Sequence, residues 1–503
     1  MSQSLLLALD QGTTSTRAIV FGMDGRQLAQ AVRPLAQSYP ADGWVEHDAE
    51  AIWRASVEVL REAVQASGHP LSRFAALGVT NQRETVVVWE RSSGRPIHPA
   101  IVWQDRRTAV QCQSLRDAGA EAEVAQTTGL LLDPYFSATK IAWILDHVPG
   151  ARPAAQAGEL LAGTIDAWLV WKLTDGAVHA TDATNASRTL LYDLRAGRWT
   201  GAMAEMFAVP LVLMPEVRDT AGDYGQTAAT VLGAPLPIRA VVGDQQGALM
   251  GQGCIAAGQM KATYGTGCFM LLHTGEQAHR SAARLLTTVA AQLNGRATYA
   301  LEGSQFIAGA AIQWVEQAFG VQGGPRAVEA LAARARPDHG VVLVPAFTGL
   351  GAPWWDADAR GALLGLTRDS GLADISAAAF DGCALQTRDL IEAMAKDAPE
   401  AFGAQAVLKI DGGMASSALF RRRLADLTGI TVRTSQTVEA TALGAALFAG
   451  MGAGLFGSAQ AAIAGLAAGD GETAAPTMDA RGRESAYARW TDAVARVRNR
   501  PPS

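Results

Sequence analysis

The feature that most constrains the fold of this chain is a hydroxyl-rich turn close to its start. The apolar run Leu5–Leu9 ends in Asp10, and the turn Gln11–Ser15 adds one glycine and three hydroxyl residues before the run Thr16–Phe21. Two short runs around such a turn predict a β-hairpin. Its N–H and O–H groups could bind a polyphosphate while Asp10 holds Mg²⁺ through water, but ordinary hairpins use the same residue types.

The same arrangement returns about half a chain later. Met260–Tyr264 is typical of a strand, Gly265–Gly267 supplies a second turn with a threonine, and Cys268–His273 predicts a return strand. Two such turns could hold phosphates from opposite sides. The repetition therefore predicts two related domains with a binding site between them.

The pattern between and after these hairpins alternates strands and helices. Expected strands are Gln27–Val32, Phe74–Thr80, Val86–Trp89, Ala240–Gly243, Val341–Pro345 and Ala406–Ile410. Expected helices are an amphipathic one that follows the N-cap Asp48, a long one at Leu372–Lys396 and a last one around Arg483–Arg498. Such alternation indicates an α/β protein with mixed sheets.

The composition excludes several classes of protein. Of the 503 residues, 49% are hydrophobic and 18% are charged, which is typical of a globular chain and not of a disordered or fibrous one. A net charge of −6 argues against a dedicated nucleic-acid binder. The four cysteines form no C-x-x-C pair and the apolar run near the start is too short for a signal peptide, so we expect reduced thiols in a cytoplasmic protein.

One segment, Ala440–Gly469, contains no charged residue and is long enough to span a membrane. Glycine and alanine dominate it, and strongly lipophilic residues are sparse. We therefore expect a buried alanine-rich helix, a glycine-rich break and a second short helix, with no membrane span.

Three further loops at expected strand ends carry polar groups. Asn81–Thr85 combines amides, a guanidinium and a carboxylate, which suits a small polyol or, equally, a solvated loop. Gly243–Gly247 includes Asp244, which could accept a proton from an attacking hydroxyl or simply cap a helix. Asp411–Gly413 would allow close approach of a ring or ribose, or be a plain strand-to-helix turn.

These motifs and several others resemble the FGGY family of carbohydrate kinases over nearly the whole chain, and within it the members that phosphorylate glycerol. The matching segments are Ala8–Ser15, Gly43–Asp48, Asn81–Thr85, Trp103–Arg107, Asp133–Ser137, Thr184–Thr189, Gly243–Gln246, Thr263–Phe269 and Pro345–Pro353. Two general family signatures are also present, at Tyr135–His147 and Gly361–Asp381.

The resemblance implies two duplicated actin-like (ribonuclease H-like) ATPase domains with an interdomain cleft. Residues 1–247 would hold the polyol site and the first phosphate hairpin, and residues 248–503 would bind the nucleotide. The implied reaction is the ATP- and Mg²⁺-dependent phosphorylation of glycerol to sn-glycerol 3-phosphate, the first step of glycerol catabolism. It further implies a cytoplasmic homo-oligomer, a dimer or tetramer, with no nucleic-acid partner; association with a glycerol channel stays open.

Carried over position by position, the resemblance assigns a role to each matching residue. Glycerol would contact Arg83, Glu84, Trp103, Tyr135, Asp244, Gln245 and Phe269, with Asp244 as the general base. The nucleotide would contact Thr13, Thr14, Ser15, Arg17, Thr266, Gly309, Gln313, Gly413 and Ser417, and Asp10 and Asp244 would hold the metal. Ser417 departs from the family, which often has asparagine there, so the contact to adenine is in doubt.

Two alternatives remain at this point. A related kinase that acts on xylulose, ribulose or gluconate would differ only in its polyol contacts. A non-catalytic sugar sensor or an actin-like assembly protein would keep the fold but would not need the carboxylates Asp10 and Asp244.

Overall fold

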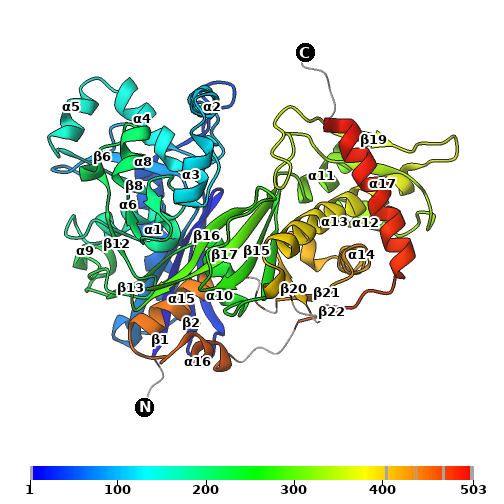
Figure 1. Ribbon diagram of the computed structural model, residues 1–503. Helices are drawn as coiled ribbons and strands as arrows, with labels where there is room; N and C mark the ends of the chain where they lie inside the picture. Colours follow the sequence, from blue (N-terminus) through cyan, green and yellow to red (C-terminus); the bar gives the residue numbers. More distant parts are fainter. Residues whose placement is uncertain (1–3, 403–405, 436, 438, 467–470, 499–503) are drawn as a thin grey trace.

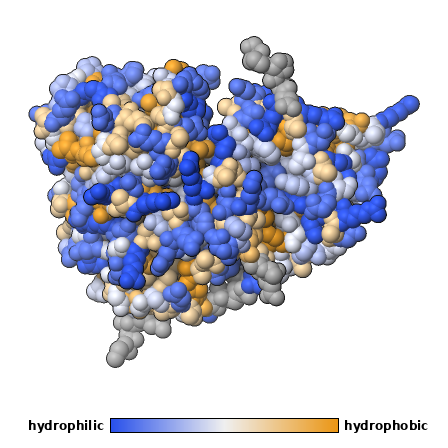
Figure 2. Space-filling view, viewed as in Figure 1, coloured by the Kyte–Doolittle hydropathy of each residue, from blue (hydrophilic) through white to orange (hydrophobic). Residues whose placement is uncertain are grey.

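The computed structural model describes residues 4–402, 406–435, 437, 439–466 and 471–498. Two lobes, each built on a twisted sheet with helices on its faces, lie side by side (Figure 1). The space-filling view shows a notch in a largely hydrophilic surface between the lobes (Figure 2). The fold is thus the two-lobed α/β architecture predicted from the sequence.

The first lobe contains a five-stranded sheet in the order β13-β5-β1-β2-β3. Its strands are β1 (Leu5–Gln11), β2 (Ser15–Gly22), β3 (Gln27–Pro34), β5 (Phe74–Asn81) and β13 (Ile238–Gly243). The first three form an antiparallel meander, and β5 and β13 run parallel to β1. The apolar run at the start is fully buried in β1, which confirms the hairpin expected there.

The second lobe repeats this order within a seven-stranded sheet, β16-β17-β15-β14-β20-β21-β22. Its strands are β14 (Met260–Tyr264), β15 (Cys268–Gly275), β16 (Leu286–Leu293), β17 (Arg296–Gln305), β20 (Val407–Asp411), β21 (Thr431–Thr434) and β22 (Thr473–Ala474). The β14–β15 hairpin is flanked by antiparallel β17 and parallel β20, just as β1–β2 is flanked by β3 and β5. The two lobes therefore share the same strand topology in their sheets.

Helices cover both sheets. In the first lobe these are α1 (Ala49–Ala66), α6 (Ile165–Leu173), α10 (Asp244–Gly251) and α15 (Ala440–Gly452); in the second they are α11 (Gly309–Ala318), α12 (Pro325–Ala332), α13 (Leu372–Asp397), α14 (Ala418–Thr428) and α17 (Ala480–Arg498). A smaller sheet in the order β4-β7-β6-β8 (Glu46–His47, Ala100–Ile101, Val86–Glu90, Leu160–Thr164) extends the first lobe. Short helices α2–α5 (Ala109–Asp117, Glu121–Thr128, Ser137–His147, Ala151–Gln156), α7 (Ala183–Ala186), α8 (Gly201–Met206) and α9 (Ala229–Leu232) complete it.

The alanine-rich helix α15 belongs to the second half of the sequence but packs against the sheet of the first lobe (Figure 1). It meets α10 so closely that a Cβ on Gly444 would lie 1.9 Å from the carbonyl oxygen of Gly247. Only glycine allows two helices to approach to this distance. The short helix α16 (Ala459–Ala464) follows a break, as expected, while residues 467–469 lie outside the described part. Within the described residues no helix is long and apolar enough to cross a membrane.

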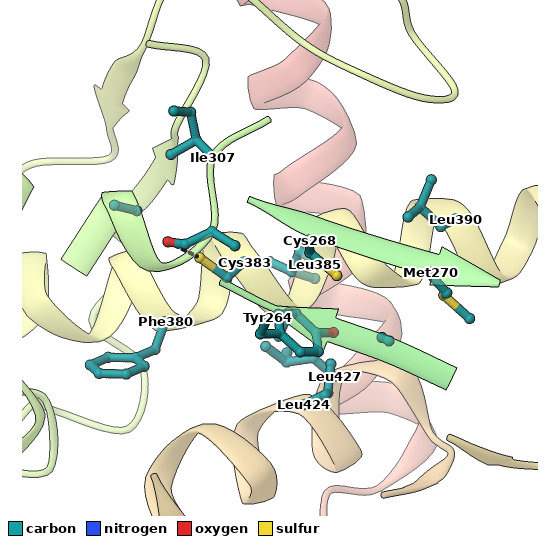
Figure 3. Packing of buried hydrophobic residues seen from close by; sticks show 14 of the residues in the cluster. Tyr264, Cys268, Met270, Ile307, Phe380, Cys383, Leu385, Leu390, Leu424 and Leu427 are labelled. Carbon is teal, nitrogen blue, oxygen red and sulfur yellow. Dashed lines mark hydrogen bonds between the residues drawn. The ribbon is translucent and has the colours of Figure 1, made fainter. Parts of the chain in front are cut away.

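The core of the second lobe lies between the β14–β15 hairpin and α13. Tyr264, Met270 and Leu385 pack there with the two thiols Cys268 and Cys383 (Figure 3). All four cysteines of the chain are buried and free, and burial raises the pKa of Cys383 to about 12. These thiols are therefore packing residues.

The hairpin β16–β17 was not expected from the sequence. Its turn, Asn294-Gly295, has positive φ at both residues (51° and 72°), which is the geometry of a type I′ turn. The Asn-Gly pair is itself a strong hairpin signal, so the sequence contained the information. This hairpin matters because β17 carries a residue of the candidate site.

Candidate active site

The polar loops of the first lobe meet because they follow neighbouring parallel strands. Asp10 lies opposite Thr80 of β5, and Gly243 at the end of β13 lies opposite Asn81. The carboxyl ends of parallel strands share one edge of a sheet, where α/β proteins bind ligands. The segments that carry Asp10, Arg83 and Asp244 are thereby brought to one edge.

Four buried charges form the floor of this edge. Arg83 donates to Glu302 from both terminal nitrogens, at 2.6 and 3.0 Å, and Arg188 donates to Glu84 at 2.6 Å and to Glu302 at 2.9 Å. All four side chains are at most 2% exposed. Burial alone would raise the pKa of Glu302, but the two guanidinium groups hold it at about 2. The cluster is a platform that pairs two guanidinium groups with two carboxylates and so fixes the orientation of Arg83 and Glu84.

The backbone at Glu84 is also constrained. Its φ of 62° places a non-glycine residue in the left-handed region, and its carbonyl oxygen accepts a hydrogen bond from the hydroxyl of Ser137 at 3.0 Å. Such conformations cost free energy and persist where the surroundings enforce them. The loop therefore presents Arg83 and Glu84 in one geometry.

Asp244 is the carboxylate that stands open to this platform. It is the first residue of α10, its side chain is 28% exposed, and its Oδ1 lies 3.2 Å from Nε of Arg83. Burial raises its pKa above the usual value of an aspartate, although Arg83 and Lys261 oppose the shift. A raised pKa makes the carboxylate a better proton acceptor than an ordinary surface aspartate.

Three aromatic rings form a wall beside these charges. Trp103 meets Tyr135 and Phe269 edge to face, with centroids 5.6 and 6.0 Å apart. The indole N–H of Trp103 donates to Oγ1 of Thr13 at 3.0 Å. The wall expected to contact the polyol is thus bonded directly to the first phosphate hairpin, and Phe269 brings the second lobe to it.

The residues expected to bind phosphate lie on the two hairpin turns. Thr13 and Thr14 lie in the β1–β2 turn, Ser15 begins β2, and Arg17 on β2 is paired at 2.8 Å with Glu439, just before α15. Thr266 lies on the β14–β15 turn, where its carbonyl oxygen accepts from the N–H groups of residues 308 and 310. One terminal nitrogen of Arg17 is therefore held by Glu439.

The residues expected to line the nucleoside site begin two helical segments of the second lobe. Gly309 opens α11, and a Cβ there would lie 2.6 Å from the carbonyl oxygen of Gly265 and 3.8 Å from Met414. Gln313 lies one turn further on and is exposed, and a Cβ on Gly413 would meet nothing within 4 Å. The turn bearing Thr266, the start of α11 and the segment after β20 therefore adjoin one another.

The hydroxyl of Ser417 has two partners within the second lobe. Its hydroxyl caps α14 by accepting from the N–H of Phe420 at 3.0 Å, and it donates to Oε1 of Glu329 at 2.6 Å. The same carboxylate oxygen accepts from the N–H of Leu419 at 3.2 Å. Ser417 thus holds the carboxylate of α12 beside the nucleoside residues.

Replacing Ser417 with alanine is expected to lower the free energy of unfolding by about 1 kcal/mol, the usual cost of losing an N-cap. It should also raise the KM for ATP about fivefold, the equivalent of one hydrogen bond. Urea unfolding and ATP titration measure the two effects. Ser458→Ala removes the N-cap of α16 and is the matched control, because it should destabilise without changing the KM for ATP. Equal ATP kinetics in the two variants would contradict a nucleotide role for Ser417.

The carboxylates expected to hold a metal are close enough to repel each other. The pKa of Asp10 is raised to about 7 by burial, with Asp244 and Glu439 adding to the shift and Arg17 opposing it. Among the described residues no group of three or more His, Cys, Asp or Glu side chains forms a metal site. Mg²⁺ typically uses one or two carboxylates, water and substrate phosphates, so this pair fits a magnesium ion that arrives with a nucleotide.

Three charged residues of the site had no assigned role in the sequence analysis: Arg188, Glu302 and Lys261. Glu302 lies on the strand β17, which was not expected from the sequence, and Lys261 lies within β14. Both side chains are fully buried. A charge inside an otherwise apolar strand needs a buried partner. A charged residue within an apolar stretch of sequence was therefore a sign of a buried ion pair. The sequence does not show which residue is its partner.

Models of the two domains of the FGGY family of carbohydrate kinases match this chain, the N-terminal domain at residues 5–251 and the C-terminal domain at residues 260–453. The chain belongs to this family. Among FGGY relatives, the glycerol kinases of Rhodospirillum rubrum and Alcanivorax borkumensis are 52% and 51% identical to it, each over 98% of both chains.

Solved structures give the same family. Plasmodium falciparum glycerol kinase with ADP is 29% identical, covers 99% of both chains and superposes with a TM-score of 0.92. Gluconate kinase from Lactobacillus acidophilus, at 18% identity and a TM-score of 0.89 over 99% of both chains, shares the fold.

Proposed function

We propose that this FGGY kinase phosphorylates glycerol with ATP, producing ADP and sn-glycerol 3-phosphate. The observation that carries the proposal is the platform of Arg83 and Glu84 beside Asp244, closed by Trp103 and Phe269. It offers a donor, an acceptor and a base next to apolar ring surface. The curated relatives at 52% and 51% identity, both glycerol kinases, support the same substrate.

The substrate would be held by complementary hydrogen bonds. Arg83 can only donate and Glu84 can only accept, so together they suit adjacent hydroxyl groups of a small polyol. The rings of Trp103, Tyr135 and Phe269 would pack on the carbon skeleton. The remaining hydroxyl would lie next to Asp244 and Gln245.

In the proposed reaction, Asp244 accepts the proton of that hydroxyl as its oxygen attacks the γ-phosphorus of ATP. Thr13, Thr14, Ser15 and Thr266 would donate to the phosphate oxygens, and Arg17 would leave Glu439 to do the same. Mg²⁺ held near Asp10 and Asp244 would supply neutralisation of the phosphate charge. Gly309, Gln313, Gly413 and Ser417 would line the nucleoside.

The wider organisation is proposed on the same grounds. Residues 1–247 would provide most of the polyol site and residues 248–503 the nucleotide site, with Phe269 and Glu302 crossing to the polyol. A cytoplasmic homo-oligomer fits the four free thiols and the family, with Mg²⁺ as the metal.

A substrate panel tests the proposal. Purified protein is assayed for ADP release with ATP, Mg²⁺ and either glycerol, xylulose, ribulose or gluconate. We expect glycerol to give the highest kcat/KM and ADP release without polyol to be slow, since the catalytic geometry completes only with substrate bound. Faster turnover of a pentulose or gluconate would assign the other substrate, and no polyol-dependent ADP release would restore the non-catalytic alternative.

A further inference from the structure

We infer that Lys261 is a positioning residue of this site, which fixes the orientation of the Gln245 amide. The inference rests on the proposed function and extends it to a residue of the opposite lobe. Lys261 is not proposed to contact glycerol or ATP and acts through Gln245.

The first observation is where the lysine points. Lys261 lies in β14 of the second lobe and is fully buried. Its Nζ donates to Oε1 of Gln245, at the start of α10, and to Oγ1 of Thr263 at 3.0 Å. The bond to Gln245 therefore joins the two lobes at the floor of the site.

The second observation concerns the direction of the amide. An ammonium group can only donate, so the partner atom in Gln245 must be its carbonyl oxygen. The NH₂ group of the same amide is then directed away from Lys261. The backbone N–H of Gln245 donates to Oδ1 of Asp244 at 2.7 Å, so this residue adjoins the proposed base. Its side-chain NH₂ group would then donate to the substrate hydroxyl that gives its proton to Asp244.

The third observation is the charge around the ammonium. Asp411, Asp244 and Glu302 face it as anions, Arg83 as a cation, and the thiols Cys254 and Cys268 are also close. The bonds to Gln245 and Thr263 fix the ammonium among these groups. Lys261 is thus a buried cation with carboxylates around it and a defined amide partner.

A matched control exists on the next strand. Lys409 of β20 is the register partner of Lys261, but its Nζ donates to the backbone oxygen of Gln252 at 2.7 Å. Lys261→Met and Lys409→Met therefore remove the same group from adjacent positions. Only the first removes a bond to a residue of the site.

The test compares steady-state kinetics of the wild type and both variants. Lys261→Met should raise the KM for glycerol at least about tenfold, the scale of a hydrogen bond to a charged group, with the KM for ATP little changed. The kcat should change by a smaller factor than the KM for glycerol, because the base Asp244 is retained. Lys409→Met should show neither effect, and thermal melting should report any general destabilisation of both.

Lys261→Arg keeps the test decisive if the methionine variant does not fold. It retains the charge, so it is expected to fold, while its wider fork should still raise the KM for glycerol. An unchanged KM for glycerol in a folded Lys261 variant would overturn the inference. A wild type that does not turn over glycerol would instead overturn the proposed function.

Discussion

Asp244→Asn is expected to lower the turnover of glycerol by about a hundredfold or more, because the amide cannot accept the proton that the carboxylate accepts. Asparagine has nearly the same shape, so the hydrogen bond from the N–H of Gln245 at 2.7 Å can be kept. The loss should therefore appear in kcat, with a smaller change in the KM for glycerol. Coupled measurement of ADP release gives both constants.

The control is an aspartate of similar chemistry outside the site. Asp42 is exposed, and Asp42→Asn should leave kcat unchanged. Thermal melting of both variants checks that the loss is not one of folding. A rate for Asp244→Asn within a few-fold of the wild type would remove Asp244 as the base.

The same carboxylate predicts a pH dependence. Because burial raises the pKa of Asp244 above that of an ordinary aspartate, the base becomes protonated at a higher pH than usual. As pH falls through that raised pKa, kcat/KM should fall with it. The measurement is a pH profile at saturating ATP, and an acid limb at the pKa of a free aspartate would contradict the assignment.

Glu302→Gln should have the second largest effect, on both stability and substrate binding. It leaves the buried Arg188 with Glu84, and the buried Arg83 with Glu84 at 4.0 Å and the partly exposed Asp244 at 3.2 Å. Removing one partner of a buried ion pair typically costs about 3–5 kcal/mol, because the remaining charge is uncompensated. Since Glu302 holds both terminal nitrogens of Arg83, the KM for glycerol should rise more than the KM for ATP.

Urea unfolding and glycerol titration measure these effects. Glu392→Gln is the matched control: it removes one of the two glutamate partners of Arg388, in a pair where the glutamate side chain is 53% exposed. Exposed pairs contribute about 1 kcal/mol or less. Similar losses in the two variants would show that the buried cluster does not have the role derived for it.

Much of the fold could be predicted from local patterns. The apolar runs around Gln11–Ser15 and Gly265–Gly267 specify two hairpins, and the structure confirms both. The glycines and alanines of 440–469 indicated a buried helix, a break and a second short helix, as found in α15 and α16. These predictions succeed because turn chemistry and burial act over a few residues.

The candidate site was predictable only in part. Arg83 and Asp244 were identified at strand ends, where the chain changes from apolar to polar. Glu302 was missed, since its partner Arg83 is 219 residues away and β17 was not recognised. Ser417 was expected beside adenine, but its hydroxyl also binds Glu329 of α12.

The sequence by itself determined the two hairpins, the α/β class and the residue types available for chemistry, because each depends on neighbours along the chain. Only the tertiary structure decided which buried charges pair across the lobes. Glu302 of β17 bonds to Arg83, and Lys261 of β14 bonds to Gln245, because these strands of the second lobe pack against the loops that follow strands of the first. The free energy of a buried charge depends on the groups packed around it in space, and local sequence does not contain that information.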